Sequence, residues 1–227
     1  MSVAATDYSF VTELVGRRSA VMLGADKQYL VESRLTPVAR DLGLGSVSEL
    51  ITRLRTTYDT ALATRVVDAM TTKETSFFRD VHPFNALREH IVPRIVEKER
   101  LRRRMRIWSA ACSTGQELYT IAIVLDQLPQ LAGWDITLHG TDLSTEALEK
   151  ARQGLYSGLE VNRGLPAPLL VRYFDREGLG YRANAKLRSS MTMAVFTEPP
   201  LDRRLRRRHA PAQSNPLVPT SSRHRRG

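Results

Sequence analysis

Apolar positions recur at helical spacing through most of the first seventy residues. Ser46, with Glu49 three residues later, has the form of a capping box just before an apolar stretch and marks a helix start. A stripe that repeats every four residues follows: Tyr58, Leu62, Val66 and Met70. Such a period is typical of an amphipathic helix that buries one face. Residues 1–70 are therefore predicted to form a small all-helical domain.

Strand-like and helical patterns alternate beyond about residue 104. The run 105–110 is short and β-like, residues 116–128 have the apolar spacing of a helix that packs on a sheet, and 134–141 form a second strand-like run. Ser144 can cap a further helix, which Gly154 ends. The order strand, helix, strand, helix predicts an α/β fold with a parallel sheet and right-handed crossovers.

The turn after the first predicted strand is a candidate ligand site, because ligands of open α/β sheets bind outside the carboxyl ends of the strands. Ala111 to Gly115 provide small residues that let the backbone approach a ligand, and Gly115 can take unusual dihedral angles. Asp142, at the tip of the second strand, resembles the acidic residue that binds ribose hydroxyls in dinucleotide sites. The turn reads CSTGQE and has no GxGxxG, so a nucleoside without a pyrophosphate fits better than a dinucleotide. A Rossmann-like sheet with another ligand is the alternative.

The net charge changes this picture little. The 227 residues carry a formal charge of +10, which on its own would suggest a nucleic-acid-binding protein. Residues 201–227 hold eight arginines and one aspartate, which leaves 26 basic and 23 acidic residues elsewhere. Most of the excess therefore belongs to the C-terminal tail, and the rest of the chain is nearly balanced.

Three further features bear on the class of protein. The single cysteine excludes a disulfide framework and is typical of a reducing compartment. No apolar run approaches the ~20 residues that a membrane-spanning helix needs. The start of the chain, MSVAATDYSF, has neither the basic residues nor the apolar core of a secretion signal. We expect a soluble, cytoplasmic protein without membrane insertion.

Three stretches occur together in a distinctive order: TTKETSFFRDVHPF (71–84), WSAACSTGQELYTIAI (108–123) and GTDLSTEALEKARQGLY (140–156). In this order they resemble the CheR family of chemotaxis receptor methyltransferases, and the resemblance runs from about residue 10 to residue 197. It implies a helical N-terminal domain followed by a Rossmann-like methyltransferase domain with a small β-subdomain. It also implies an enzyme of chemotaxis adaptation that uses S-adenosylmethionine, without a metal, to esterify glutamates of chemoreceptor cytoplasmic domains.

The sequence patterns and the resemblance together predict a division of the chain, with the tail predicted from its composition alone. The expected parts are a helical N-terminal domain (1–70), a cofactor-contacting segment with a linker helix interrupted at Pro93 (71–104), a partial Rossmann-like methyltransferase domain (105–197) that includes a candidate β-subdomain (155–190), and a basic disordered tail (198–227). A hairpin in the β-subdomain is expected to turn at Asp175 to Gly180. That turn is short for a member that grips a receptor's C-terminal pentapeptide, so pentapeptide-independent docking is predicted.

The resemblance also implies roles for five residues. Lys73, Thr75 and Arg79 are expected at the mouth of the cofactor pocket, with Arg79 as the catalytic residue near the methionine carboxylate and the methyl group. Some members of the family have asparagine where Lys73 stands. Glu117 is expected near the amino group of the cofactor, and Asp142 at its ribose. No metal ligands are implied.

Simpler structural roles are open for three of these residues. Glu117 could complement a helix dipole, Asp142 could cap the next helix, and Arg79 could pair with Asp80 or Glu74 on the surface. On the resemblance we favour the ligand roles.

The remaining residues of the first motif and of the turn have expected structural roles. Phe77 and Phe78 would anchor their segment in the core so that its polar residues reach the ligand. Cys112 is expected to be a small thiol packed in a tight turn, not a nucleophile.

The family pattern disappears after Val195. The tail is rich in Arg, Pro and Ser, as in disordered segments, and 192–227 is too short to build the later half of the sheet, since one βαβ unit takes about 30 residues. We therefore expect a truncated, monomeric enzyme that retains only one side of its cofactor pocket. On the sequence alone, the truncated chain could be either active or inactive. The alternatives are a non-catalytic receptor-docking fragment and, less favoured, nucleic-acid binding through the arginines of the tail.

Overall fold

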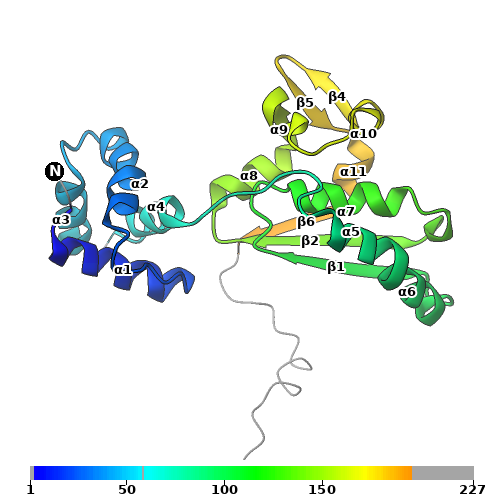
Figure 1. Cartoon of the computed structure of the whole chain (residues 1–227), viewed down its shortest axis with the longest axis horizontal. Coiled ribbons are helices and arrows are strands. Elements are labelled where there is room, and N and C mark those ends of the chain that lie inside the picture. The colour runs from blue at the N-terminus through cyan, green and yellow to red at the C-terminus, as the bar shows by residue number, and fades with distance from the viewer. Residues whose placement is uncertain (1–2, 58, 196–227) are drawn as a thin grey trace, which may run out of the picture. The chain divides into compact units, whose positions relative to one another are not determined.

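The computed structural model describes residues 3–57 and 59–195 (Figure 1). The tail at 198–227, which the sequence predicts to be disordered, lies outside the described residues, as does Tyr58 of the predicted helical stripe. Among the described residues, no helix has the length and apolar character needed to cross a membrane.

The described part of residues 1–70, coloured blue to cyan in Figure 1, forms four helices: α1 (Ala5–Ser19), α2 (Gln28–Asp41), α3 (Val47–Thr57) and α4 (Thr60–Met70). Their apolar faces meet in one buried cluster of their own. The predicted start of α3 is confirmed, because the backbone N–H of Glu49 donates to Ser46 Oγ at 3.1 Å. The Glu49 carboxylate accepts the N–H of Gly45, at 2.9 Å, one residue earlier than in a standard capping box.

The described residues of the predicted four-residue stripe lie on one helix. Leu62, Val66 and Met70 are buried in α4 as predicted. The helix begins only after Asp59, whose carboxylate accepts the N–H groups of Ala61 and Leu62 at 2.9 and 3.0 Å. Such an N-cap satisfies the free donors of a helix start, and the chain therefore begins a new helix here.

The predicted linker helix is continuous but changes its pitch. It consists of α5 (Val81–Ala86), a π-helical turn (Leu87–Ile91) and α6 (Val92–Glu99). Pro93, at the start of α6, has no N–H to donate to the preceding turn. The interruption predicted at Pro93 thus takes the form of a π-helical turn just before it, not a break.

A three-stranded parallel sheet follows, with the strand order β1-β2-β6. Its strands are β1 (Arg104–Ala110), β2 (Asp135–Asp142) and β6 (Met191–Val195). Between β1 and β2 the chain forms α7 (Gln116–Asp126) and a 3₁₀ turn (Pro129–Leu131), and after β2 it forms α8 (Thr145–Gln153). Ser144 caps α8 and Gly154 ends it in the left-handed region, as predicted. The predicted parallel α/β arrangement is confirmed.

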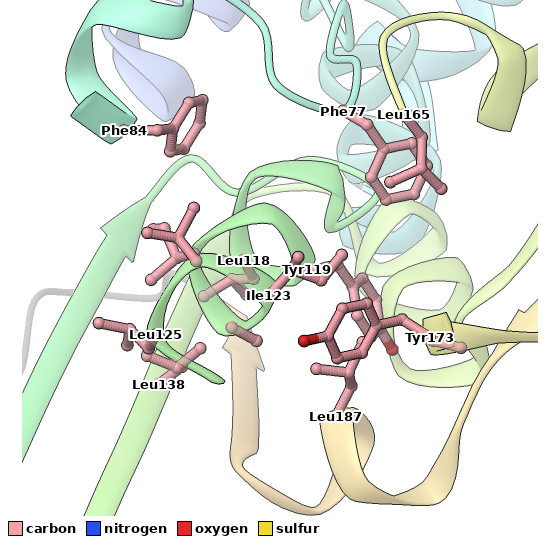
Figure 2. Packing of buried hydrophobic residues seen from close by; sticks show 14 of the residues in the cluster. Phe77, Phe84, Leu118, Tyr119, Ile123, Leu125, Leu138, Leu165, Tyr173 and Leu187 are labelled. Atoms are coloured by element: carbon pink, nitrogen blue, oxygen red, sulfur yellow. The ribbon is translucent and has the colours of Figure 1, made fainter. Parts of the chain in front are cut away.

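Helix α7 is the centre of the core. Only Glu117 and Asp126 of its eleven residues are not buried, as expected for a helix covered by a sheet and by further elements. Figure 2 shows Leu118, Ile123 and Leu125 on this helix, with Leu138 of β2 in the same buried cluster.

The β-subdomain lies between α8 and β6 in the chain. It contains β3 (Leu155–Ser157), α9 (Gly158–Asn162), α10 (Ala167–Tyr173), β4 (Phe174–Glu177), β5 (Gly180–Ala183) and α11 (Ala185–Ser189). The strands form a second, antiparallel sheet in the order β3-β5-β4. The β4–β5 hairpin turns at Gly178 and Leu179, within the stretch predicted to turn.

Candidate active site

A cavity of about 680 Å³ opens at the carboxyl ends of β1 and β2. Its volume is within the roughly 300–1,000 Å³ that small-molecule sites occupy. The walls come from segment 71–80, from the loop after β1, from the first turns of α7 and from the tip of β2. All five residues expected at the cofactor line this one cavity: Lys73, Thr75, Arg79, Glu117 and Asp142.

The loop after β1 has a strained backbone. Ala111 and Ser113 have φ values of 61° and 50°, in the left-handed region that few residues other than glycine adopt. Gly115 has a φ of 91°, which confirms its predicted unusual conformation. A Cβ at Gly115 would lie 2.8 Å from the Cβ of Ala151, so this glycine lets α7 pack closely on α8. Strain of this kind is concentrated at functional sites and persists where the surroundings hold it.

Asp142 ties the loop after β1 to the loop after β2. Its Oδ2 accepts the N–H of Ser113 at 2.7 Å, and its Oδ1 accepts the N–H of Ser144 at 2.9 Å. Ser144, not Asp142, is the N-cap of α8, because its hydroxyl accepts the N–H of Ala147 at 3.2 Å. Each carboxylate oxygen keeps a further lone pair. Asp142 can therefore accept a hydroxyl donor from a ligand while it holds the loops.

Glu117 stands in the first turn of α7 with its side chain exposed to the cavity. The hydroxyl of Ser109, on β1, donates to Glu117 Oε1 at 2.7 Å. This contact fixes the carboxylate beside the cavity and leaves Oε2 without a hydrogen bond to Ser109. A negative charge near the N-terminus of a helix is also favourable for the helix itself.

Segment 71–80 is held by its two phenylalanines, as expected. The Phe77 ring is fully buried and meets the rings of Tyr156 and Phe174 edge to face, at centroid distances of 5.0 and 5.5 Å. The Phe78 ring packs on Phe84, and the Phe78 N–H donates to Thr120 Oγ1 at 3.1 Å. This anchoring brings the polar residues of the segment to the cavity wall.

Arg79 lines the cavity with about half of its side chain exposed. Its Nη1 donates to the main-chain oxygen of Glu74 at 2.8 Å, and its Nη2 lies 4.0 Å from the Glu74 carboxylate. The pairing of Arg79 with Glu74, one of the simpler roles considered from the sequence, is therefore present. It holds the guanidinium at the cavity, where N–H groups remain for a ligand, since guanidinium has five.

Lys73 and Thr75 differ in their surroundings. The ammonium of Lys73 lies 2.9 Å from Glu146 Oε2 and holds the pKa of that carboxyl below its usual range. The main-chain oxygen of Lys73 accepts the hydroxyl of Ser113 at 3.0 Å, which joins the segment to the loop after β1. Thr75 is half-buried in the cavity wall.

Cys112 has the structural role expected of it. The side chain is buried, and burial raises the pKa of the thiol to about 12. The thiol is therefore protonated at neutral pH, and only the thiolate is a good nucleophile.

Some residues that position the site carry no signal in the sequence. Ser109 and Ser113 orient Glu117 and Asp142, but isolated serines near a strand end are common in any α/β protein. Glu146 meets Lys73 across 73 positions of the chain, and no local pattern predicts such a pair.

Two family models match adjoining parts of the chain, from residue 6 to residue 197. Residues 6–71 match the all-alpha domain of CheR methyltransferases, and residues 73–197 match their SAM binding domain. The chain belongs to the CheR methyltransferase family. The predicted all-helical N-terminal domain and α/β cofactor domain are thereby confirmed, and S-adenosylmethionine (SAM) is the cofactor that the CheR domain binds. All five expected site residues lie within the SAM binding domain.

Individual CheR relatives agree with the family match. The chain is 40% identical over 185 residues to chemotaxis protein methyltransferase 1 of Pseudomonas aeruginosa, covering 79% of this chain and 66% of the relative. It is 38% identical over 202 residues to chemotaxis protein methyltransferase Cher2 of Pseudomonas putida, covering 86% and 73%. It is 36% identical over 166 residues to the chemotaxis protein methyltransferase of Salmonella typhimurium, covering 73% and 55%. The chain thus spans about two thirds of the length of the curated relatives it matches.

Proposed function

We propose that this chain transfers a methyl group from SAM to glutamate carboxylates of chemotaxis receptors, forming glutamate methyl esters and S-adenosylhomocysteine (SAH). The observation that carries the proposal is the convergence of Arg79, Glu117 and Asp142 on one cavity of suitable volume within the matched SAM binding domain. The receptors, and with them a cytoplasmic location and a monomeric enzyme, follow from the family and are part of the proposal. So are the boundaries 1–70, 71–104, 105–197 and 155–190.

The charges around the cavity fit SAM. Its ammonium group can donate hydrogen bonds to the Glu117 carboxylate, and its ribose hydroxyls can donate to the free lone pairs of Asp142. Arg79 can bind a carboxylate through charge-assisted hydrogen bonds. The acceptor groups of the site come from α7 and β2, whereas the cation comes from segment 71–80. A zwitterionic ligand with a ribose therefore finds a partner for each of its polar parts.

The reaction needs little acid or base catalysis. A glutamate carboxylate, with an ordinary pKa of about 4.3, is ionised at neutral pH and needs no base. Bound SAM supplies a sulfonium methyl group, and the ester O–C bond forms as the S–C bond breaks, without proton transfer. The work of the protein is to align the carboxylate with the methyl carbon and to control the local field. Arg79 is the residue we propose for that alignment.

Calorimetric titration of the purified chain with SAH, followed by methylation of a receptor cytoplasmic fragment with radiolabelled SAM, tests the proposal. We expect micromolar SAH affinity and base-labile label on receptor glutamates. Absence of SAH binding by the folded chain would refute the cofactor site. Binding without transfer would refute the enzymatic role and leave the receptor-docking alternative.

Docking to the receptor is proposed to be independent of a C-terminal pentapeptide. The support is the β4–β5 hairpin, whose turn consists of Gly178 and Leu179. Leu179 is 98% exposed, and so short a turn offers little surface for gripping a peptide. Receptor fragments with and without the pentapeptide should bind with the same affinity. A tenfold preference for the peptide-bearing fragment would contradict the prediction.

A further inference from the structure

The turn after α9 touches the cofactor-contacting segment at successive residues. The Arg163 guanidinium lies 2.8 Å from the carboxylate of Glu74. Gly164 lies against the main chain of Phe77. The side chain of Leu165 belongs to the same buried cluster as the Phe77 ring, and both are labelled in Figure 2. Two neighbouring residues of the β-subdomain, Arg163 and Gly164, thus contact Glu74 and Phe77 of segment 71–80.

The approach at Gly164 is too close for any other residue. Its φ of +100° is a conformation that L side chains rarely adopt. A Cβ built there would lie 3.1 Å from the carbonyl carbon of Phe77 and closer still to the carbonyl oxygen. These are backbone atoms, so no change of rotamer could make room. A side chain at position 164 would therefore have to move the main chain of Phe77.

The main chain that Gly164 abuts leads directly to the catalytic candidate. Phe78 and Asp80, on either side of Arg79, have φ values of 49° and 53°. Residues in such a conformation are strained and persist only where neighbouring structure holds them. Glu74 adds a second connection, since its carboxylate pairs with Arg163 and its main-chain oxygen accepts Arg79.

The turn itself is well supported. Ser157 and Glu160 form a capping box at the start of α9. Glu160 is also paired with Lys150 of α8, and the hydroxyl of Tyr156 donates to the main-chain oxygen of Thr114 at 2.7 Å. Helix α9 is therefore fixed to α8, and β3, which leads into α9, is fixed to the loop after β1.

We propose that Arg163 and Gly164 are positioning residues, which set the path of segment 71–80 and thereby the placement of Arg79 at the cofactor cavity. The expected effect of these residues on SAM binding rests on the proposed function. Their expected effect on the path of segment 71–80 does not. Arg163 acts through the Glu74 ion pair, and Gly164 acts through contact with the Phe77 main chain. Neither residue needs to touch the cofactor.

The test combines two measurements on the full chain. Hydrogen exchange without any ligand reports on the Phe78 amide, which is bonded to Thr120 Oγ1, and calorimetry reports the SAH affinity. Gly164→Ala should speed exchange at Phe78 and weaken SAH binding by about tenfold or more, because the main chain that carries Arg79 would be displaced. Arg163→Ala should weaken SAH binding by only about two- to fivefold, since exposed ion pairs contribute little.

Rescue separates positioning from general loss of stability. Arg163→Lys should keep wild-type affinity, and the reversed pair Glu74→Arg with Arg163→Glu should bind SAH better than either single variant. Arg176→Ala, an exposed arginine on β4 of the same subdomain, is the matched control and should change neither readout.

Two results would overturn the inference. Unchanged Phe78 exchange in folded Gly164→Ala would show that the turn does not set the segment. If the effects of Glu74→Arg and Arg163→Glu on SAH affinity are strictly additive in the double variant, Arg163 does not position segment 71–80 through Glu74. If the wild-type chain fails to bind SAH, the proposed function fails, and the exchange measurement still decides the positioning of the segment.

Discussion

The replacement Asp142→Asn separates the structural role of this residue from its proposed ligand role. The Asp142 carboxylate accepts two backbone N–H groups, from Ser113 at 2.7 Å and from Ser144 at 2.9 Å. Asparagine has nearly the same shape but only one oxygen. Whichever way the amide is oriented, its NH₂ group faces one of the two N–H donors, and that donor loses its partner.

The magnitude follows from that single lost contact. An unsatisfied buried donor costs about 1–3 kcal/mol, and the remaining hydrogen bond is weakened because its acceptor is no longer charged. We therefore expect Asp142→Asn to lower the free energy of unfolding by about 1–3 kcal/mol. If the remaining lone pairs of Asp142 accept ribose hydroxyls, SAH affinity should fall as well, by about tenfold, the equivalent of ~1.4 kcal/mol.

Ser144→Ala is the matched control. It removes the cap hydroxyl of α8 and should lower the free energy of unfolding by about 1 kcal/mol, but it keeps the main-chain N–H that Asp142 accepts. Urea denaturation at pH 7 and SAH calorimetry are measured for both variants. We expect a stability loss in both and an affinity loss only in Asp142→Asn. An SAH affinity within twofold of wild type for folded Asp142→Asn would refute the ligand role and leave Asp142 as a loop clamp.

Three further predictions concern catalysis, pH and packing. Arg79→Ala should lower methyl transfer by at least about 100-fold with a smaller change in SAH affinity, since the residue is proposed to align the reacting groups; equal turnover would remove it from the mechanism. Burial raises the pKa of Asp68, so its charged form disfavours folding above that pKa. Asp68→Asn should therefore raise Tm at pH 7, by at most about 3 °C for this partly exposed group, with the gain shrinking as the pH falls towards 4; a constant gain would contradict the assignment. A Cβ at Gly140 would lie 2.9 Å from Cys112 Sγ and closer to Leu118, so Gly140→Ala should lower the urea midpoint by the equivalent of about 1–3 kcal/mol, and an unchanged midpoint would show that the core can yield there.

The elements that the sequence predicted well are those with local signals. Ser144 and Gly154 mark the ends of α8 because caps act through neighbouring backbone groups, within a turn of the residue itself. The start of α3 at Ser46 is predictable for the same reason. The four-residue apolar stripe did not predict where α4 begins, because an apolar period alone does not detect that Asp59 caps a new helix. The hydrogen bonds of the Asp59 cap, and not the apolar period, set the start of this helix.

The five candidate residues were predicted from the sequence and line one cavity, but the contacts that hold them there were not predictable. The strand pattern and the family resemblance both pointed to Asp142, and the resemblance pointed to Glu117. The contacts that orient these two residues come from Ser109 and Ser113, whose spacing carries no signal. The Glu74–Arg163 pair joins residues 89 positions apart. Such contacts depend on how the β-subdomain packs against segment 71–80, and that packing is set by burial of whole elements and not by any short stretch of sequence.

The structural and ligand roles that the sequence presented as alternatives are compatible in this fold. Arg79 pairs with Glu74 and still lines the cavity, because the pairing uses only part of its guanidinium. Asp142 holds two loops through backbone donors and still has acceptor positions, because each carboxylate oxygen has two lone pairs. A charged group that is already fixed by the protein loses little side-chain entropy when a ligand binds. Under the proposed function, the contacts that made the simpler roles plausible also hold these residues in place for a ligand. A variant that breaks such a contact should then weaken ligand binding even where the ligand-facing group is retained.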